Sequence, residues 1–258
     1  MNRLALFKAY LVKEFAIFRR YLPNTIGGIV TFYVIFLLIF LGYTGIAGGS
    51  PNYGDMVEDL IVGFVLWSLI LMSYQNIAFT IKDEAQEGTL EQLYMSPYNF
   101  GWIITSHVSA RLIINFVIIA VILTLIMLTT GNWLNINLLS IIPLTVFTLM
   151  GVLGVGFAVG GITLLYKRID SYLQILQFAM VGLVAAPSES VIWLRFLPAS
   201  WGSTLIRRVM VQGASIMDFS FGELSLLILI GCFYLAVGYG IYKKAEQKAM
   251  KQGILGHY

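Results

Sequence analysis

Charged residues are scarce in this sequence, and their scarcity sets the first limit on what the chain does. Asp, Glu, Lys and Arg make up 11% of the 258 residues, while 59% are hydrophobic. A soluble globular domain has about 25% charged residues, which cover its water-facing surface. The composition therefore excludes a soluble enzyme, a nucleic-acid-binding module and a disordered protein. It predicts a polytopic membrane protein.

Residues that carry catalysis or bind metals are also few. The single cysteine, Cys232, lies in an apolar run without a disulfide or CxxC partner, so we interpret it as a small buried hydrophobe. The two histidines are His107, in a connecting segment, and His257, in the tail. No HExxH or GxSxG motif occurs, and no pair of carboxylates lies within an apolar run. We therefore expect no catalytic and no metal site, and an intramembrane enzyme or proton-driven carrier is disfavoured.

The chain also lacks the Walker sequence GxxxxGK[ST], so it does not hydrolyse nucleotides by that route, and we expect it to bind no cofactor. Its densest glycine run, at 151–161, lies inside an apolar stretch. Gly156 and Gly160 have the GxxxG spacing that lets membrane helices approach closely, and Ala236 and Gly240 repeat the small-residue spacing. We predict helix packing at these positions rather than phosphate binding.

Long apolar runs are what the sequence does contain. A bilayer core about 30 Å thick is crossed by roughly 20 helical residues, and several runs approach that length. They predict one all-α transmembrane domain over 1–258, with six spans at 25–43, 60–81, 112–130, 138–166, 171–186 and 224–242. We interpret the first run as a retained span rather than a signal peptide. In the fourth, Pro143 predicts either a kink or a later helix start.

Two further segments have distinctive patterns. Residues 3–21 predict an interfacial amphipathic helix ahead of the first span, the alternative being a basic cytoplasmic lead-in. Its apolar stripe is formed by Leu4, Phe7, Leu11, Phe15 and Phe18. Residues 187–223 are partly apolar but interrupted by Pro198, which predicts an outer re-entrant or interfacial hairpin before the last span.

Basic residues are unevenly placed about these spans. With the N-terminus inside, only three of the 16 Lys and Arg residues fall on the outer side, namely Arg195, Arg207 and Arg208. Basic segments beside membrane spans stay in the cytoplasm. Six spans would also return the chain to its starting side, so we expect both termini to be cytoplasmic. The basic tail from Lys243 to Lys251 is expected to contact anionic membrane lipid.

The connecting segment 82–111 is the most informative part of the sequence. Unlike the other inner segments it is acidic, with Asp83, Glu84, Glu87 and Glu91. Thr89 and Gln92 have capping-box spacing, and one apolar face is formed by Leu90, Leu93 and Tyr94. These features predict a short amphipathic helix beneath the membrane. It fits a docking surface for a cytoplasmic partner, but a solvated loop helix whose charges only face water remains open.

The stretch EAQEGTLEQLYMSP at 84–97 resembles the E-x-x-x-G-T-L-E-x-L-x-x-[ST]-P loop of type-2 ABC exporter permeases. These are the membrane-spanning subunits of exporters for drugs, lipids and polysaccharides. The expected architecture is similar too: an amphipathic N-terminal helix, six spans, the motif after the second span, and a broken apolar hairpin before the last. One departure lies at 21–43, which only partly resembles the aromatic-rich segment of polysaccharide-exporting relatives.

The resemblance implies a coupling loop, a set of partners and a location. Residues 82–97 would dock in a cleft of a separate ATP-binding subunit, through Glu84, Glu87, Gly88, Thr89, Leu90, Glu91 and Leu93. Gly88 would permit a bend, Thr89 would cap the helix, the leucines would fill an apolar groove and the acids would pair with basic groups. The assembly would contain two permeases, as a homodimer or heterodimer, and two ATPase copies that bind ATP and Mg²⁺. It would lie in the plasma membrane of a prokaryote.

On this view the chain is a transport subunit and not an enzyme, and it moves a hydrophobic or amphipathic substrate such as a drug, lipid or lipid-linked glycan outward. ATP binding on the partner would bias the permease dimer between states. The alternative is a non-transporting membrane scaffold or assembly factor whose loop docks another cytoplasmic protein. The transported substrate is not indicated by any motif.

Polar residues within the spans are weaker candidates. Gln75 and Asn76 lie near the inner end of the second span, and Gln174 and Gln177 lie in the fifth. They could contact substrate along its route, or form interhelical hydrogen bonds worth roughly a kcal/mol or less, which we favour. In the outer segment, Arg207 and Arg208 could pair with anionic head groups or with Glu189, or serve only as surface anchors.

Overall fold

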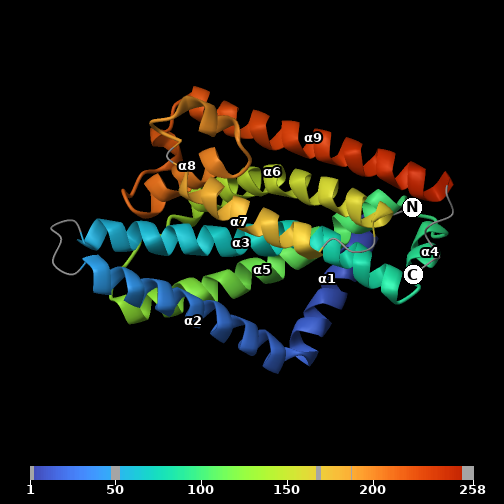
Figure 1. Cartoon of the computed structure of the whole chain (residues 1–258), viewed down its shortest axis with the longest axis horizontal. Helices are drawn as coiled ribbons and strands as arrows, with labels where there is room; N and C mark the ends of the chain where they lie inside the picture. The colour runs from blue at the N-terminus through green and yellow to red at the C-terminus, as the bar shows by residue number, and fades with distance from the viewer. Residues whose placement is uncertain (1–2, 48–52, 167–169, 187, 252–258) are drawn as a thin grey trace.

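A computed structural model describes residues 3–47, 53–166, 170–186 and 188–251, and every regular element in these ranges is helical. Long helices lie side by side along the longest axis of the molecule (Figure 1). Five of the described helices are long and apolar enough to cross a membrane. They are α2 (Leu22–Ala47), α3 (Tyr53–Gln86), α5 (Phe100–Thr130), α6 (Leu138–Leu165) and α9 (Phe221–Lys251). The prediction of an all-helical polytopic membrane protein is confirmed.

The remaining elements are shorter. α7 (Asp170–Ala185), at the position of the expected fifth span, has 16 residues, which at 1.5 Å per residue extend about 24 Å. The outer segment contains η1 (Ile192–Phe196), α8 (Ser200–Met210) and η2 (Ile216–Asp218). Residue 187, the first residue of the expected re-entrant segment, lies outside the described ranges.

Several helices extend beyond the apolar runs. α5 begins at Phe100 rather than near 112, because Asn99 caps it: the Asn99 side chain accepts a hydrogen bond of 3.0 Å from the Gly101 N–H. The connecting loop is thereby reduced to 87–99, and it contains the short helix α4 (Leu90–Tyr94). α6 begins at Leu138 with Pro143 inside it, so the later start that Pro143 suggested does not occur.

Glycines allow the closest helix contacts. A Cβ on Gly156 would lie 3.0 Å from the carbonyl oxygen of Tyr74, and one on Gly160 would lie 2.8 Å from Ile77, so both glycines pack against α3. Between α6 and α9, a Cβ on Gly238 would overlap the Gly154 backbone. Gly240 has nothing within 4 Å of such an atom. The α6–α9 contact therefore does not use the Ala236–Gly240 spacing.

The two ends of the bundle differ. The last turns of α9 lie at the same end as α4, whereas α8 lies at the other end (Figure 1). The helix α1 (Arg3–Arg20) runs across the bundle and contacts α5. Cys232 is exposed on α9, so the interpretation of this residue as a buried hydrophobe was wrong. An apolar helix that faces lipid has no need to bury a thiol.

Candidate functional site

The connecting loop begins with a turn that closes the end of α3. Gly88 has φ of 71°, in the left-handed region that favours glycine. The Thr89 N–H donates to the Glu84 carbonyl oxygen at 2.9 Å, which is the bond that defines a Schellman motif. The Thr89 hydroxyl also donates to that carbonyl at 3.1 Å and to the Glu84 carboxylate. Thr89 therefore bonds back to α3, whereas the capping-box spacing had predicted that it caps α4.

One face of α4 packs against the chain itself. Leu93 and Tyr94 are half-buried against a cluster that includes Ile77 and Phe100, and the Tyr94 ring stacks on Phe100 with centroids 4.1 Å apart. Leu93 is thus partly covered within this chain. The side chains of Leu90 and Glu91 lie outside the described part of the structure.

The opposite face of the loop is open. Met95 is 78% exposed, and the side chains of Glu87 and Gln92 are exposed beside it in the sequence. We call Glu87, Gln92 and Met95 the outward face of the loop. An acid, an amide and a flexible thioether suit a contact with a protein partner better than one with lipid.

Tyr94 also links α4 to the last helix. In α9, Tyr242 is fully buried and Glu246 is 3% exposed, with its carboxylate 2.5 Å from Lys243 Nζ. Burial raises the pKa of the Tyr94 phenol, and the charge of Glu246 raises it further. Tyr94 therefore stays neutral, and its hydroxyl has no hydrogen-bond partner among the described residues. Its contact with α9 is one of packing.

The N-terminal helix is held by a polar contact that the sequence pattern did not predict. Glu14, 6% exposed, lies 2.7 Å from His107 Nε2 of α5, and the Tyr10 ring stacks on His107 with centroids 5.1 Å apart. Burial alone would raise the pKa of Glu14, but His107, Arg111 and Lys13 together hold it below its usual value. α1 is thus anchored by a buried carboxylate.

The residues of the expected apolar stripe of α1 differ in how far the chain itself covers them. Leu4 is 75% exposed and Phe15 is 57% exposed, while Phe7, Leu11 and Phe18 are half-buried. Glu14 lies four residues before Phe18 and three after Leu11, so it stands on the buried face. An acid at that position in an otherwise apolar face was the signal that could have identified the anchor.

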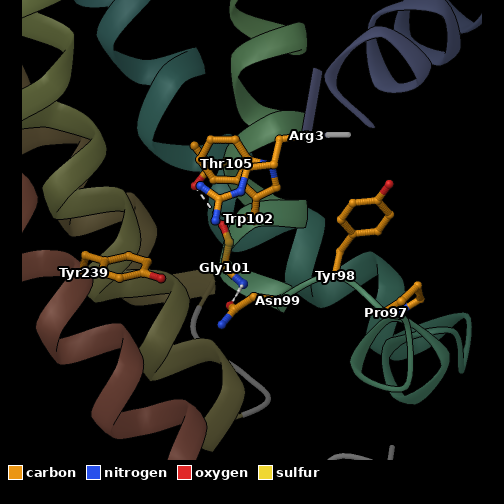
Figure 2. A pocket seen from close by; sticks show the side chains of 8 residues that line it. All are labelled: Arg3, Pro97, Tyr98, Asn99, Gly101, Trp102, Thr105 and Tyr239. Carbon is orange, nitrogen blue, oxygen red and sulfur yellow. Dashed lines mark hydrogen bonds between the residues drawn. The ribbon is translucent and has the colours of Figure 1, made fainter. Parts of the chain in front are cut away.

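A pocket of about 590 Å³ lies where α1, the end of the connecting loop, α5 and α9 meet (Figure 2). Its walls include Arg3, Trp102 and Tyr239, and the Arg3 guanidinium lies 5.2 Å from the centroid of the Trp102 ring. Lys243 Nζ stands 3.3 Å from Asn99 Oδ1. Because four separate segments form this pocket, no local sequence pattern indicates it.

The polar residues predicted within the spans do not form one surface. Gln75 donates to the Tyr74 hydroxyl at 3.4 Å, and that hydroxyl donates to the Leu173 carbonyl at 3.2 Å, which joins α3 to α7. Asn76 is buried, whereas Gln174 is exposed on α7 and Gln177 is half-buried. The Gln75 contact lies within α3, and the bond that crosses to α7 is made by Tyr74.

At the other end of the bundle, ion pairs hold α8. Arg207 Nε lies 3.5 Å from Asp59 of α3. Arg208 lies 2.6 Å from Glu189 and 2.8 Å from Glu223 of α9. The two arginines therefore connect the outer segment to both neighbouring helices, and Arg208 pairs with Glu189, one of the alternatives that the sequence left open.

Within the described residues, no group of three or more His, Cys, Asp or Glu side chains gathers as a metal site would require. Neither family models nor curated proteins yield a match to this chain. The resemblance at 84–97 therefore rests on its motif and on the order of the helices.

Proposed function

We propose that this chain is the transmembrane permease subunit of an ATP-driven ABC-type exporter, which moves a hydrophobic or amphipathic substrate out of the cytoplasm. The observation that carries the proposal is the connecting loop. Its sequence resembles the coupling motif, it closes α3 with a glycine-dependent turn, and it leaves Glu87, Gln92 and Met95 exposed. A separate ATP-binding subunit would dock on this outward face.

The packing of the loop offers a route for mechanical coupling. A push on α4 would reach α3 through the Thr89–Glu84 bonds and α9 through the packing of Tyr94. Both are long apolar helices, and α6 lies against each of them. These helices would have two arrangements, and ATP binding on the partner would shift the equilibrium between them. A ligand can do this only if the assembly binds it more tightly in one arrangement than in the other.

The proposal includes a membrane arrangement. α7 serves as the fifth of six spans, with local bilayer thinning to match its 16 residues. The end with α4 and the last turns of α9 faces the cytoplasm, since the basic residues gather there. The outer segment with η1 and α8 then forms the re-entrant hairpin. Two copies of the chain, or this chain and a related one, would enclose the pathway.

A membrane scaffold is the second candidate, because it would use the same outward face without transport. The test is co-purification with an ATPase candidate that carries a Walker motif, followed by ATP turnover in vesicles. Glu87→Gln should weaken assembly and lower turnover. Gln247→Lys, an exposed change on α9 that alters the charge by the same amount, is the matched control.

The outcomes separate the candidates. Turnover stimulated by the chain, and lost in Glu87→Gln alone, supports the permease. Assembly that depends on Glu87 without any change in turnover supports the scaffold. If both variants assemble and turn over like the unmodified chain, the loop is not the docking surface and the proposal fails.

A further inference from the structure

The pocket of Figure 2 has basic groups at its edge and no acidic lining. None of the residues that line it is Asp or Glu. Arg3 belongs to the lining, and Lys243 is directed to the edge by its contact with Asn99. The carboxylate beside Lys243, Glu246, is itself buried and bound to that lysine. The pocket therefore favours an anion.

Arg3 is available to such an anion. None of the ion pairs among the described residues includes Arg3, and its guanidinium carbon lies over the Trp102 ring, 5.2 Å from the centroid, in a cation–π contact. In Figure 2 its side chain extends over the indole at the upper edge of the pocket. A guanidinium held on a ring keeps its in-plane N–H groups for a phosphate or carboxylate.

The depth of the pocket in the bilayer points to the source of the anion. Trp102 lies two residues after the first residue of α5, and Tyr239 lies on α9 just before Lys243 and Lys244. Trp and Tyr gather at the level of lipid head groups, and basic residues follow them. Arg3 is on the helix that crosses the bundle at this end. The anion most abundant at that level is the lipid phosphate.

We propose that this pocket binds the phosphate of an anionic phospholipid head group. Arg3 and Lys243 contact the phosphate, and the faces of Trp102 and Tyr239 pack on the glycerol. A choline group would suit the aromatic walls, but the Arg3 guanidinium repels it, so a glycerol phosphate head group is preferred to a zwitterionic one. The inference does not require the transport function, because any membrane protein with this pocket would bind the lipid.

The test uses the full chain in phosphatidylcholine vesicles that contain brominated phosphatidylglycerol or, separately, brominated phosphatidylcholine. Bromine quenches nearby indoles, and the difference between the unmodified chain and Trp102→Phe isolates Trp102 among the five tryptophans. At equal mole fractions the glycerol lipid should quench Trp102 more strongly. Arg3→Gln should reduce that preference about fivefold, since the loss of a contact worth about 1 kcal/mol lowers a binding constant by about that factor.

Arg20→Gln is the matched control, because Arg20 lies on the same helix over an aromatic ring, Tyr21, but outside the pocket. Equal losses in Arg3→Gln and Arg20→Gln would mean general attraction of α1 to the membrane and would overturn the site. Displacement of the quenching lipid by free glycerol phosphate would show that the ligand is a soluble phosphate. If Arg3→Gln does not insert, equal quenching of the unmodified chain by both lipids is sufficient to reject the proposal.

Discussion

The carboxylate of Glu14 and the imidazole of His107 meet 2.7 Å apart, and both side chains are more than nine-tenths buried. They join the first helix of the chain to a helix that lies beyond two intervening spans. Loss of one partner from a buried pair destabilises the protein by more than the net contribution of the bond. The remaining polar group is then left without a hydrogen bond to either protein or water. The pair therefore fixes where α1 lies on the bundle.

Replacement of Glu14 should release α1 from α5. Glu14→Ala leaves His107 buried without its partner, and we expect a loss of roughly 1–3 kcal/mol in docking, while Glu14→Gln keeps an acceptor oxygen and should lose less. In a chain with Cys232→Ser, cross-linking of cysteines introduced at Arg3 and Trp102, which lie in contact between α1 and α5, measures the docked fraction. Glu14 variants that cross-link as well as the parent would show that packing alone holds α1.

Acid should have the same effect in the unmodified protein. Because the pKa of Glu14 is lower in the folded than in the unfolded chain, the pairing contributes stability above the unfolded carboxyl value of about 4.3. That contribution is lost as the pH falls through the folded pKa. The distance between fluorescent probes attached to the two cysteines at neutral pH should increase as the pH is lowered from 7 to 3, and Glu14→Gln should remove the dependence.

Gly88→Ala should loosen the connecting loop. A Cβ at this position meets nothing within 4 Å, so no atom would clash with the alanine side chain. The loss of stability comes only from holding alanine in the left-handed conformation, with φ of 71°, and is about 1–2 kcal/mol. Hydrogen exchange of the α4 amides should accelerate by roughly five- to thirtyfold. Gly182→Ala is the control, since Gly182 is equally open but helical. Unchanged exchange in Gly88→Ala would mean that the turn does not depend on glycine.

The sequence was informative where the signal is local and periodic. Long apolar runs predicted the membrane helices, and Gly88 before an acidic amphipathic stretch marked the turn that the structure contains. Helix ends were less predictable: α5 includes polar residues such as Thr105 and His107, which hydropathy assigned to a loop. Those residues are helical because Asn99 caps the helix and α1 covers them.

The site itself depends on contacts between distant segments. The position of Leu93 on α4 predicted a contact with a partner. It did not indicate the cluster with Ile77 and Phe100, which partly covers this side chain. The pocket beside Arg3 likewise needs three helices to converge. Such features follow from tertiary packing, which no spacing rule along the chain encodes.

Gly238→Ala should destabilise the contact between α6 and α9. The added methyl group would overlap the backbone of Gly154, which cannot rotate away, and overpacking of this kind typically costs about 1–3 kcal/mol. Gly240→Ala, two residues along the same helix with open space around it, should cost nothing in packing. Thermal unfolding in detergent, followed by circular dichroism, measures both. Because alanine is the better helix former, a similar loss in the two variants would point to lipid contacts rather than to the α6–α9 packing.

Two substitutions at Tyr94 distinguish packing from hydrogen bonding in the contact between α4 and α9. Its hydroxyl makes no well-formed hydrogen bond to any residue that the structure describes, so Tyr94→Phe should leave stability unchanged or slightly higher. Tyr94→Ala removes the ring that stacks on Phe100 and should cost roughly 3–5 kcal/mol locally. If the proposed coupling is right, partner-stimulated ATP turnover should survive Tyr94→Phe and fail in Tyr94→Ala, while binding of the partner to Glu87 is retained. Loss of turnover in Tyr94→Phe would instead require a hydrogen bond from this hydroxyl in another state of the protein, and would contradict coupling by packing alone.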